Sequence, residues 1–354
     1  MNTSLPKLLA MLSIQPPIKG DESLLRLAQH RLADAGLGGE FYPGSPDHLR
    51  HLLSFRPEAQ ACVAHLPRGI NLLSTSGRET IQQFAEIAAE HLYGILLHDQ
   101  RIFADQPQET LNAMRDIEHR LSGLAHAPKV FIEYAAGLEP EFFSWLFEET
   151  ADLSKVCAAI DISHVGIHIC RQQYAMQHPN EDVCAMRPDS PDLPEKIDAI
   201  QNAVVATRPL VNQLVERLSR LDKPLHFHLH DGHPLSTLSL FGVSDHLSFL
   251  QPIRLPFAYQ GRHTLDGIFG VNGFTKLIHT VMQQRPAEQL SFTVEMHPQE
   301  GHTPLREYAS LFSHWRDTSQ ATHMNYWLDM LTNNATLVRN ACQTAYSTSG
   351  ATGS

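Results

Sequence analysis

The stretch Val156-Cys157-Ala158-Ala159-Ile160-Asp161 is an uninterrupted apolar run that ends on a carboxylate. Continuous apolar runs, without polar alternation, are typical of parallel strands that other elements cover on both faces. Working outward from this run, most of seven further short segments have the same character. The sequence therefore predicts eight strands: Lys7–Ile14, Gly38–Tyr42, Ala61–His65, Gly94–His98, Lys129–Glu133, Val156–Asp161, Pro224–His230 and Leu290–Glu295.

Amphipathic helical patterns separate these strands. After the first strand, apolar residues recur on one face from Leu24 to Ala35, with Asp21 as a candidate N-cap and Gly36 as a stop. Five more segments repeat the pattern: Arg78–His91, Gln108–Leu124, Glu139–Ala151, Pro194–Leu221 and Val271–Gln284. Eight strands that alternate with helices predict an α/β protein with a (β/α)8 TIM barrel. An open doubly wound sheet is the alternative, but no GxGxxG motif follows the first strand.

The domain organisation is predicted to be simple. Residues 1–303 are expected to form the barrel, because no internal repeat or low-complexity linker divides them. Residues 304–354 are expected to form a helical C-terminal extension that packs on the barrel or makes a contact in a homodimer. Two long segments, Ile169–Glu195 and Gly232–Asp266, read as irregular loops at the face where barrels carry active sites, so either could be a lid.

Charge and composition exclude several classes of function. The chain has 27 Lys and Arg against 38 Asp and Glu, a net charge of −11 that opposes broad contact with a nucleic-acid backbone. Five cysteines form no CxxC pair, so no disulfide framework or zinc ribbon is indicated. No apolar run approaches the roughly 20 residues that cross a bilayer. We therefore expect a cytoplasmic protein that acts on a small molecule, without a membrane or nucleic-acid partner.

Ionisable side chains stand at the carboxyl ends of six predicted strands. They are His65, His98, Glu133, Asp161, His228 with His230, and Glu295, and His164 lies three residues beyond Asp161. Because the carboxyl ends of barrel strands meet at one mouth, these groups are expected to converge. Burying three carboxylates together without a cation would be costly in repulsion and desolvation. The pattern therefore predicts a site for divalent metal ions.

The seventh strand carries three histidines on one face, because strand side chains alternate with a period of two. We expect His228 to be a metal ligand and His226 to lie deeper in the barrel. His230 and Asp231, nearer the rim, could support the ligands or serve a second ion.

The set of Glu133, Asp161, His228 and Glu295 resembles the metal ligands of the xylose-isomerase-like barrel superfamily, which includes sugar epimerases and the endonuclease IV branch. Four segments are similar to that branch. Ala64–Leu72 resembles its His-x-Pro…Ile-Asn-Leu segment, Leu97-His98 its next histidine, Asp161–His164 its Asp-x-x-His and Phe227–Asp231 its His-x-Asn-Asp. The similarity covers residues 60–296 and lies in the order and spacing of these motifs.

The resemblance implies a cluster of two or three divalent ions, which could be zinc, manganese or iron. It implies that His65, His98 and Glu133 hold one ion, and that Glu133 bridges to a second. The second ion would be held by Asp161, His228 and Glu295, and His164 would serve a third.

The third site departs from the branch, which has Asp-x-His after the seventh strand. Ser244-Asp245-His246 is out of register and Gly261-Arg262-His263 lacks the Asp, so His246 and His263 are both candidate ligands. The early glycine-rich motif of the DNA-binding members is also absent, and Ile14-Gln15-Pro16-Pro17 stands in its place.

Two enzyme classes are consistent with these residues. A metal cluster favours hydrolysis, most simply of a phosphoester or a related small molecule, with Glu133, Glu295 and His164 as catalytic groups. Arg68 or Arg262 would hold the anionic substrate. A sugar isomerase or epimerase would instead use one metal and exchange a proton between the two glutamates. It does not need His65 and His98, so their presence favours the cluster.

Three further readings stay open. Iron in such a ligand set would permit oxidative chemistry. DNA repair of the endonuclease type is a minor alternative, given the acidic balance of the chain. A barrel that binds a metabolite or a partner without catalysis is the non-enzymatic alternative.

Overall fold

The computed structural model describes residues 5–12, 22–57, 61–135, 137–182, 191–232, 246–250, 253–259, 261–265, 267–296 and 320–350. The chain divides into two compact units. Unit 1 comprises Met1–Ile160, Arg217–His228 and Arg285–Val294, and unit 2 comprises Asp161–Glu216, Leu229–Gln284 and Glu295–Ser354. Both units are therefore built from segments that lie far apart in the sequence.

Eight parallel strands close into a barrel, in the order β1-β10-β7-β6-β5-β4-β3-β2. They are β1 (Lys7–Leu12), β2 (Gly38–Phe41), β3 (Val63–His65), β4 (Gly94–His98), β5 (Lys129–Tyr134), β6 (Val156–Asp161), β7 (Leu225–Leu229) and β10 (Leu290–Val294). All eight predicted strands are confirmed, and the predicted bounds differ by only a few residues. The barrel belongs to unit 1, apart from the last residues of β6 and β7, Asp161 and Leu229.

The inside of the barrel is filled by side chains. Leu96, Phe131, Cys157 and Ala159 form a buried apolar cluster contributed by β4, β5 and β6. The residues that follow this cluster toward the carboxyl ends of the strands are aligned by the strand register. That register pairs His98 at the end of β4 with Glu133 on β5. Ionisable groups are thus placed next to one another at the carboxyl ends of neighbouring strands.

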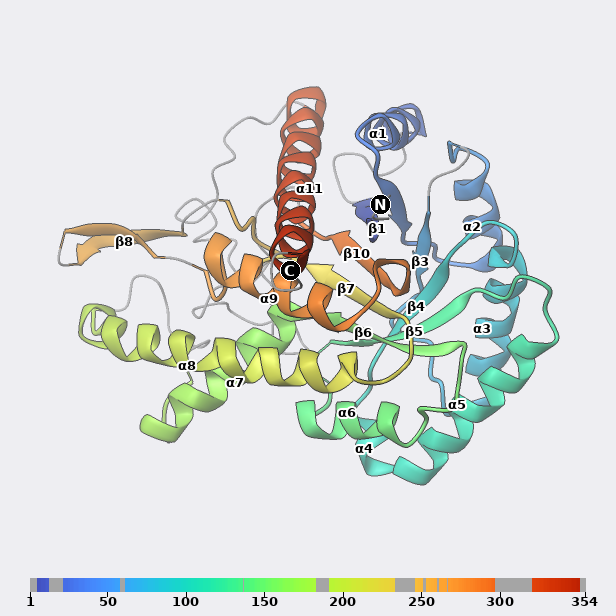
Figure 1. Cartoon of the computed structure of the whole chain (residues 1–354), viewed down its shortest axis with the longest axis horizontal. Coiled ribbons are helices and arrows are strands. Elements are labelled where there is room, and N and C mark those ends of the chain that lie inside the picture. The colour runs from blue at the N-terminus through green and yellow to red at the C-terminus, as the bar shows by residue number, and fades with distance from the viewer. Residues whose placement is uncertain are drawn as a thin grey trace. The chain divides into compact units, whose positions relative to one another are not determined.

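In the described part of unit 1, six α-helices follow the strands, and α2, α3 and α5 lie outside the barrel in Figure 1. They are α1 (Glu22–Asp34), α2 (Pro46–Leu53), α3 (Thr75–Ala88), α4 (Ile102–Asp105), α5 (Pro107–Ser122) and α6 (Pro140–Glu148), with a short 3-10 helix, η2 (Ala287–Gln289). Helix α1 stops as predicted at Gly36, whose φ is +69°. The candidate N-cap Asp21 lies outside the described residues. The short helices α2 and α4 were not predicted, although Ser45 before Pro46 caps α2.

Unit 2 holds helices α7 (Ile162–Gln177), α9 (Gly270–Gln284) and α11 (Gln320–Gly350), and all but the last residues of α8 (Leu193–Ser219). The prediction of an irregular segment from Ile169 is wrong over its first part, because α7 continues to Gln177. Gly232–Asp266 contains an antiparallel hairpin of β8 (Ile253–Tyr259) and β9 (Arg262–Leu265) rather than loop alone.

The C-terminal helix is confirmed over the described part of the tail. His279 on α9 lies 2.9 Å from the hydroxyl of Thr344 on α11, and the indole of Trp327 donates to the carbonyl of Met296. Residues 304–319 of the predicted helical tail lie outside the described residues.

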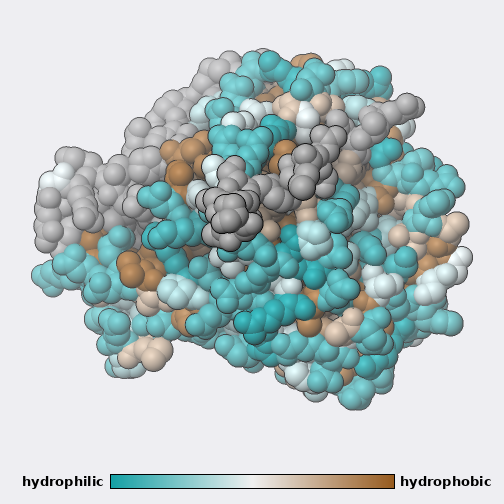
Figure 2. Space-filling view, in the orientation of Figure 1, coloured by the Kyte–Doolittle hydropathy of each residue, from teal (hydrophilic) through white to brown (hydrophobic). Residues whose placement is uncertain are grey.

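The described helices have no candidate membrane span, since none is both long enough and apolar enough to cross a bilayer. On the face drawn in Figure 2, hydrophilic residues predominate and hydrophobic ones are scattered.

Candidate metal centre

Two histidines and a glutamate from three neighbouring strands converge in unit 1. The Nε2 atom of His65 on β3 lies 3.0 Å from Oε2 of Glu133 on β5, and Nε2 of His98 on β4 lies 3.2 Å from the same oxygen. The two Nε2 atoms are 3.1 Å apart. Donor atoms at such separations fit around one cation, whose bonds to histidine nitrogen and carboxylate oxygen are about 2.0–2.2 Å.

The contact made by the other ring nitrogen of His65 determines which nitrogen faces Glu133. Its Nδ1 lies 3.2 Å from the carbonyl oxygen of Leu66, and a carbonyl can only accept a hydrogen bond. Nδ1 therefore carries a proton, and Nε2 is the nitrogen that faces Glu133 and His98 and could bind a metal. The ring also stacks on Tyr42, with 4.9 Å between centroids.

The electrostatics of the group keep its carboxylate ionised. Burial by itself raises the pKa of Glu133, but His228, His98 and His65 outweigh it and hold that pKa well below its ordinary value. Burial lowers the pKa of His98, and its net shift is downward despite Glu133. The pKa of His65 is raised, because its contacts with Glu133 outweigh burial. An anionic oxygen is therefore available for a cation.

A second set of buried groups in unit 1 surrounds His228 on β7. Its Nδ1 lies 3.1 Å from Oε1 of Glu133, and its Nε2 lies 3.0 Å from Oε1 of Glu40 on β2. Burial by itself raises the pKa of Glu40, but His228 and His226 outweigh it and lower that pKa to about 2. Glu40 is not among the predicted site residues, and its only signal in the sequence is a charged residue inside the predicted apolar strand Gly38–Tyr42.

His226 lies within the barrel, as its place on β7 suggested. Its side chain is fully buried, and its ring centroid lies 5.2 Å from that of Phe131 in the apolar cluster. Nδ1 lies 2.8 Å from the hydroxyl of Ser291, and Nε2 lies 3.2 Å from that of Thr293.

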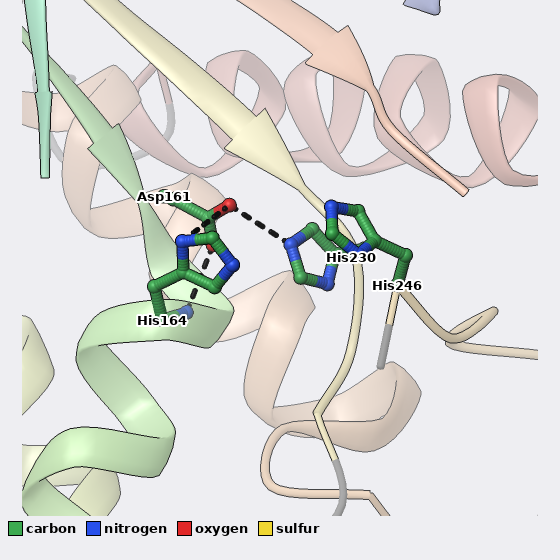
Figure 3. A group of neighbouring side chains, drawn as sticks. All are labelled: Asp161, His164, His230 and His246. Atoms are coloured by element: carbon green, nitrogen blue, oxygen red, sulfur yellow. Dashed lines mark hydrogen bonds and ion pairs between the residues drawn. The ribbon is translucent and has the colours of Figure 1, made fainter. Parts of the chain in front are cut away.

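Unit 2 contains a group of four side chains, shown in Figure 3: Asp161, His164, His230 and His246. Oδ1 of Asp161 accepts a hydrogen bond from the backbone of His164, which caps α7 and turns this histidine toward the carboxylate. Oδ2 lies 2.9 Å from Nε2 of His230 and 3.3 Å from Nδ1 of His164. The ring of His246 stacks on that of His230, with centroids 4.2 Å apart.

His230 in this group has the same arrangement as His65. Its Nδ1 lies 3.2 Å from the carbonyl oxygen of Asp231, so Nε2 is the nitrogen that faces Asp161. Burial lowers the pKa of His230, but the neighbouring carboxylates outweigh it and raise that pKa overall. His246 adopts a φ of +47° and lies 3.5 Å, at Nε2, from Oε1 of Glu295.

Asp231 in unit 2 has a carboxylate that holds a backbone segment in place. Its carboxylate accepts hydrogen bonds from the backbone amides of Gly232, Phe269 and Gly270. A Cβ atom on Gly267 would lie 2.1 Å from one of its oxygens, so the chain needs a glycine there. Asp231 therefore fixes the segment that leads into α9.

Other predicted ligands divide between the units. Asp161 and Glu295 belong to unit 2, whereas Glu133 and His228 belong to unit 1. The second ion that the resemblance implies draws on both units and stays a prediction. Of the two candidates for the third site, His246 joins the group around Asp161.

Two arginines were expected to bind substrate. Arg68 is exposed, and its charge contributes to lowering the pKa of His98, which places it near the group in unit 1. Arg262 and His263 lie on β9, and their side chains are outside the described part of the structure.

Asp99, which follows His98, is a further buried carboxylate that is not among the predicted site residues. Its Oδ1 accepts hydrogen bonds from the backbone amides of Ala135 and Gly137. Burial raises the pKa of Asp99 to about 7, against the lowering effect of these amides. Its only signal in the sequence was a second ionisable residue directly after a predicted ligand.

Comparison with known proteins gives no family. No family model matches the chain, and no curated protein matches it. A solved structure named AsfvAP:AG has a TM-score of 0.49 and 12% identity, covering 95% of this chain and 100% of that one. The carboxyl transferase domain of Rhizobium etli pyruvate carboxylase with 3-bromopyruvate has a TM-score of 0.38 and 10% identity, covering 94% of this chain and 48% of that one. Similarity at this level carries no information about function, which rests on the side chains alone.

Proposed function

We propose that this chain is a divalent-metal-dependent enzyme with a multinuclear metal site at the carboxyl ends of the barrel strands. The observation that carries the proposal is the convergence of His65 and His98 on one oxygen of Glu133. A group of two imidazoles and an ionised carboxylate suits zinc, manganese or iron. We expect two or three ions in all.

Glu133 supports a site for more than one ion. Its Oε2 faces His65 and His98, and its Oε1 faces Nδ1 of His228. A carboxylate whose two oxygens face different imidazoles is suited to bridge two cations. The group around Asp161 in unit 2 would hold a further ion through His164, His230 and His246.

The reaction that we propose is hydrolysis of a small, phosphorylated metabolite. Bound metal ions would supply an acidified water and stabilisation of negative charge on the attacked group. Residues of the chain would position the ions and the substrate. Glu133 would bridge the ligands on its two sides, and Arg68 would bind the anionic group of the substrate. Glu295 and His164 would carry protons near the reacting atoms.

A one-metal isomerase or epimerase is the alternative. Its chemistry needs two glutamates on opposite sides of a sugar carbon, but it has no use for both His65 and His98. The close packing of these two histidines on Glu133 therefore favours the cluster. Iron in the same ligands would permit oxidation, and the net charge of −11 disfavours a nucleic-acid substrate.

Elemental analysis tests the proposal. Untagged protein purified without chelators is expected to contain two or three equivalents of metal per chain, and His65→Ala is expected to lower that number by about one, because it removes a ligand of one ion only. One equivalent, unchanged by His65→Ala, would support the isomerase. No metal even after zinc, manganese or iron is added back would contradict the proposal.

A further inference from the structure

Glu40 is a buried carboxylate on β2 that faces His228 on β7. Its side chain is fully inaccessible to solvent, and its oxygens lie 3.0 and 3.1 Å from Nε2 of His228. The hydroxyl of Tyr42 donates to the same carboxylate at 3.2 Å. A carboxylate this deeply buried is destabilising unless fixed partners compensate for its lost hydration. His228 and Tyr42 are such partners.

The two nitrogens of His228 face two different glutamates. Nε2 faces Glu40, and Nδ1 lies 3.1 Å from Oε1 of Glu133. Because an ionised carboxylate only accepts hydrogen bonds, the nitrogen that faces Glu40 carries a proton. Nδ1 faces the ionised Glu133 and so also donates in the metal-free protein, and a bound cation would take the place of that proton.

Glu40, His226 and His228 lie close enough together to hold a cation, but His226 has other polar partners. Its Nδ1 faces the hydroxyl of Ser291 and its Nε2 faces that of Thr293, and the latter nitrogen lies 3.6 Å from Glu40. Both nitrogens of this ring therefore have hydroxyl partners. The close contact of Glu40 with an imidazole is the one with His228.

We infer that Glu40 is a positioning residue for the metal centre, which keeps His228 protonated on Nε2 and so presents Nδ1 beside Glu133. The inference rests on the proposed function insofar as His228 is a metal ligand. Partners that orient a ligating histidine in this way typically contribute about 10- to 100-fold to metal affinity. Glu40→Gln is therefore expected to weaken zinc binding by about that factor, while the number of ions bound at saturating zinc stays unchanged.

The experiment compares wild-type protein with Glu40→Gln and a matched control, Thr293→Val. The control removes a buried hydroxyl that faces His226, and it leaves the contact between Glu40 and His228 in place. Zinc affinity is measured by competition with a chromogenic chelator. The protonation of His228 is measured in the metal-free protein by NMR of 15N-labelled histidine, with His228→Asn used to assign the signal.

The expected result is weaker zinc binding and a smaller Nε2-protonated fraction of His228 in Glu40→Gln, with both quantities near wild type in Thr293→Val. An unchanged affinity or an unchanged Nε2 signal in Glu40→Gln overturns the inference. If Glu40→Gln fails to fold, Glu40→Asp withdraws the carboxylate by one methylene and is expected to act in the same direction. A wild-type protein that binds no zinc contradicts the proposed function instead, and the NMR comparison alone then decides the role of Glu40.

Discussion

Replacing Glu133 by Gln should destabilise the metal-free protein. The Glu133 carboxylate is 1% exposed and faces three imidazoles at 3.0, 3.2 and 3.1 Å. The amide of Gln lacks the charge, and its nitrogen cannot accept a hydrogen bond, so the contacts on one oxygen are lost outright. Removing one partner from a buried ion pair costs about 3–5 kcal/mol. We expect a loss of that size in the free energy of unfolding.

Added zinc should increase the difference in stability between Glu133→Gln and the wild type. Zinc at 100 times its Kd stabilises a protein by about 2.7 kcal/mol for each site that is present only in the folded state. The wild type is expected to gain this stabilisation, whereas Glu133→Gln, which lacks the shared ligand, is expected to gain little.

The assay is urea unfolding at pH 7, first with chelator and then with added zinc. The control is Glu181→Gln, which breaks a surface ion pair with Lys196, so its free energy of unfolding should stay close to that of the wild type. A metal-free Glu133→Gln protein as stable as the control would refute the view that this carboxylate organises the three histidines. Equal stabilisation of variant and wild type by zinc would remove Glu133 from the metal site.

Three more predictions concern separate features. Glu295→Gln is expected to abolish turnover while the melting temperature stays within a few degrees of wild type. Glu148→Gln should reduce the acid sensitivity of stability, because hydrogen bonds from Arg217 hold the pKa of Glu148 below its ordinary value. Because the pKa of Glu148 is lower in the folded state, its ionised carboxylate stabilises that state at pH values above the ordinary pKa. This stabilisation is lost as the pH falls through the lowered pKa, so the urea midpoints of the two proteins should converge in acid. Gly267→Ala should destabilise the protein by about 1–3 kcal/mol, since its Cβ would overlap the carboxylate of Asp231.

A fully active Glu295→Gln variant would remove this residue from the reaction. Urea midpoints that differ equally at neutral and acid pH would show that the charge of Glu148 does not contribute. Gly69→Ala is the control for Gly267→Ala, because no atom lies within 4 Å of the Cβ it would add. Equal stability of the two alanine variants would contradict the tight fit around Asp231.

The barrel could be predicted because each strand can be recognised from the residues of its own short segment. Apolar runs such as 129–133 and 156–161 are short, continuous and bounded by helical patterns, and these signals do not depend on distant residues. The start of α7 was harder to predict, because the residue that caps it, Asp161, is also the last residue of a strand. No helix was predicted for Ile162–Gln177, and the part from Ile169 was read as irregular.

The site could be predicted less completely than the barrel. His65, His98 and Glu133 were predicted together, since strand ends in a barrel share one level. Glu40 was missed because a single sequence does not show that β2 turns a charged side chain to meet β7. The register of the strands decides that contact, and no local pattern encodes it.

The two carboxylate oxygens of Asp161 have different partners. Oδ1 caps helix α7 by accepting a hydrogen bond from the backbone of His164, and Oδ2 faces the imidazoles of His164 and His230. This double use limits how the protein can be redesigned. Exchange of a histidine for another ligand type, such as His164→Cys, changes what the group can bind and leaves the Asp161 side chain that caps α7 in place. Exchange of Asp161, even for Glu, also alters the first turn of a helix. An engineer who wants a different metal in this group should therefore vary the histidines and keep the aspartate.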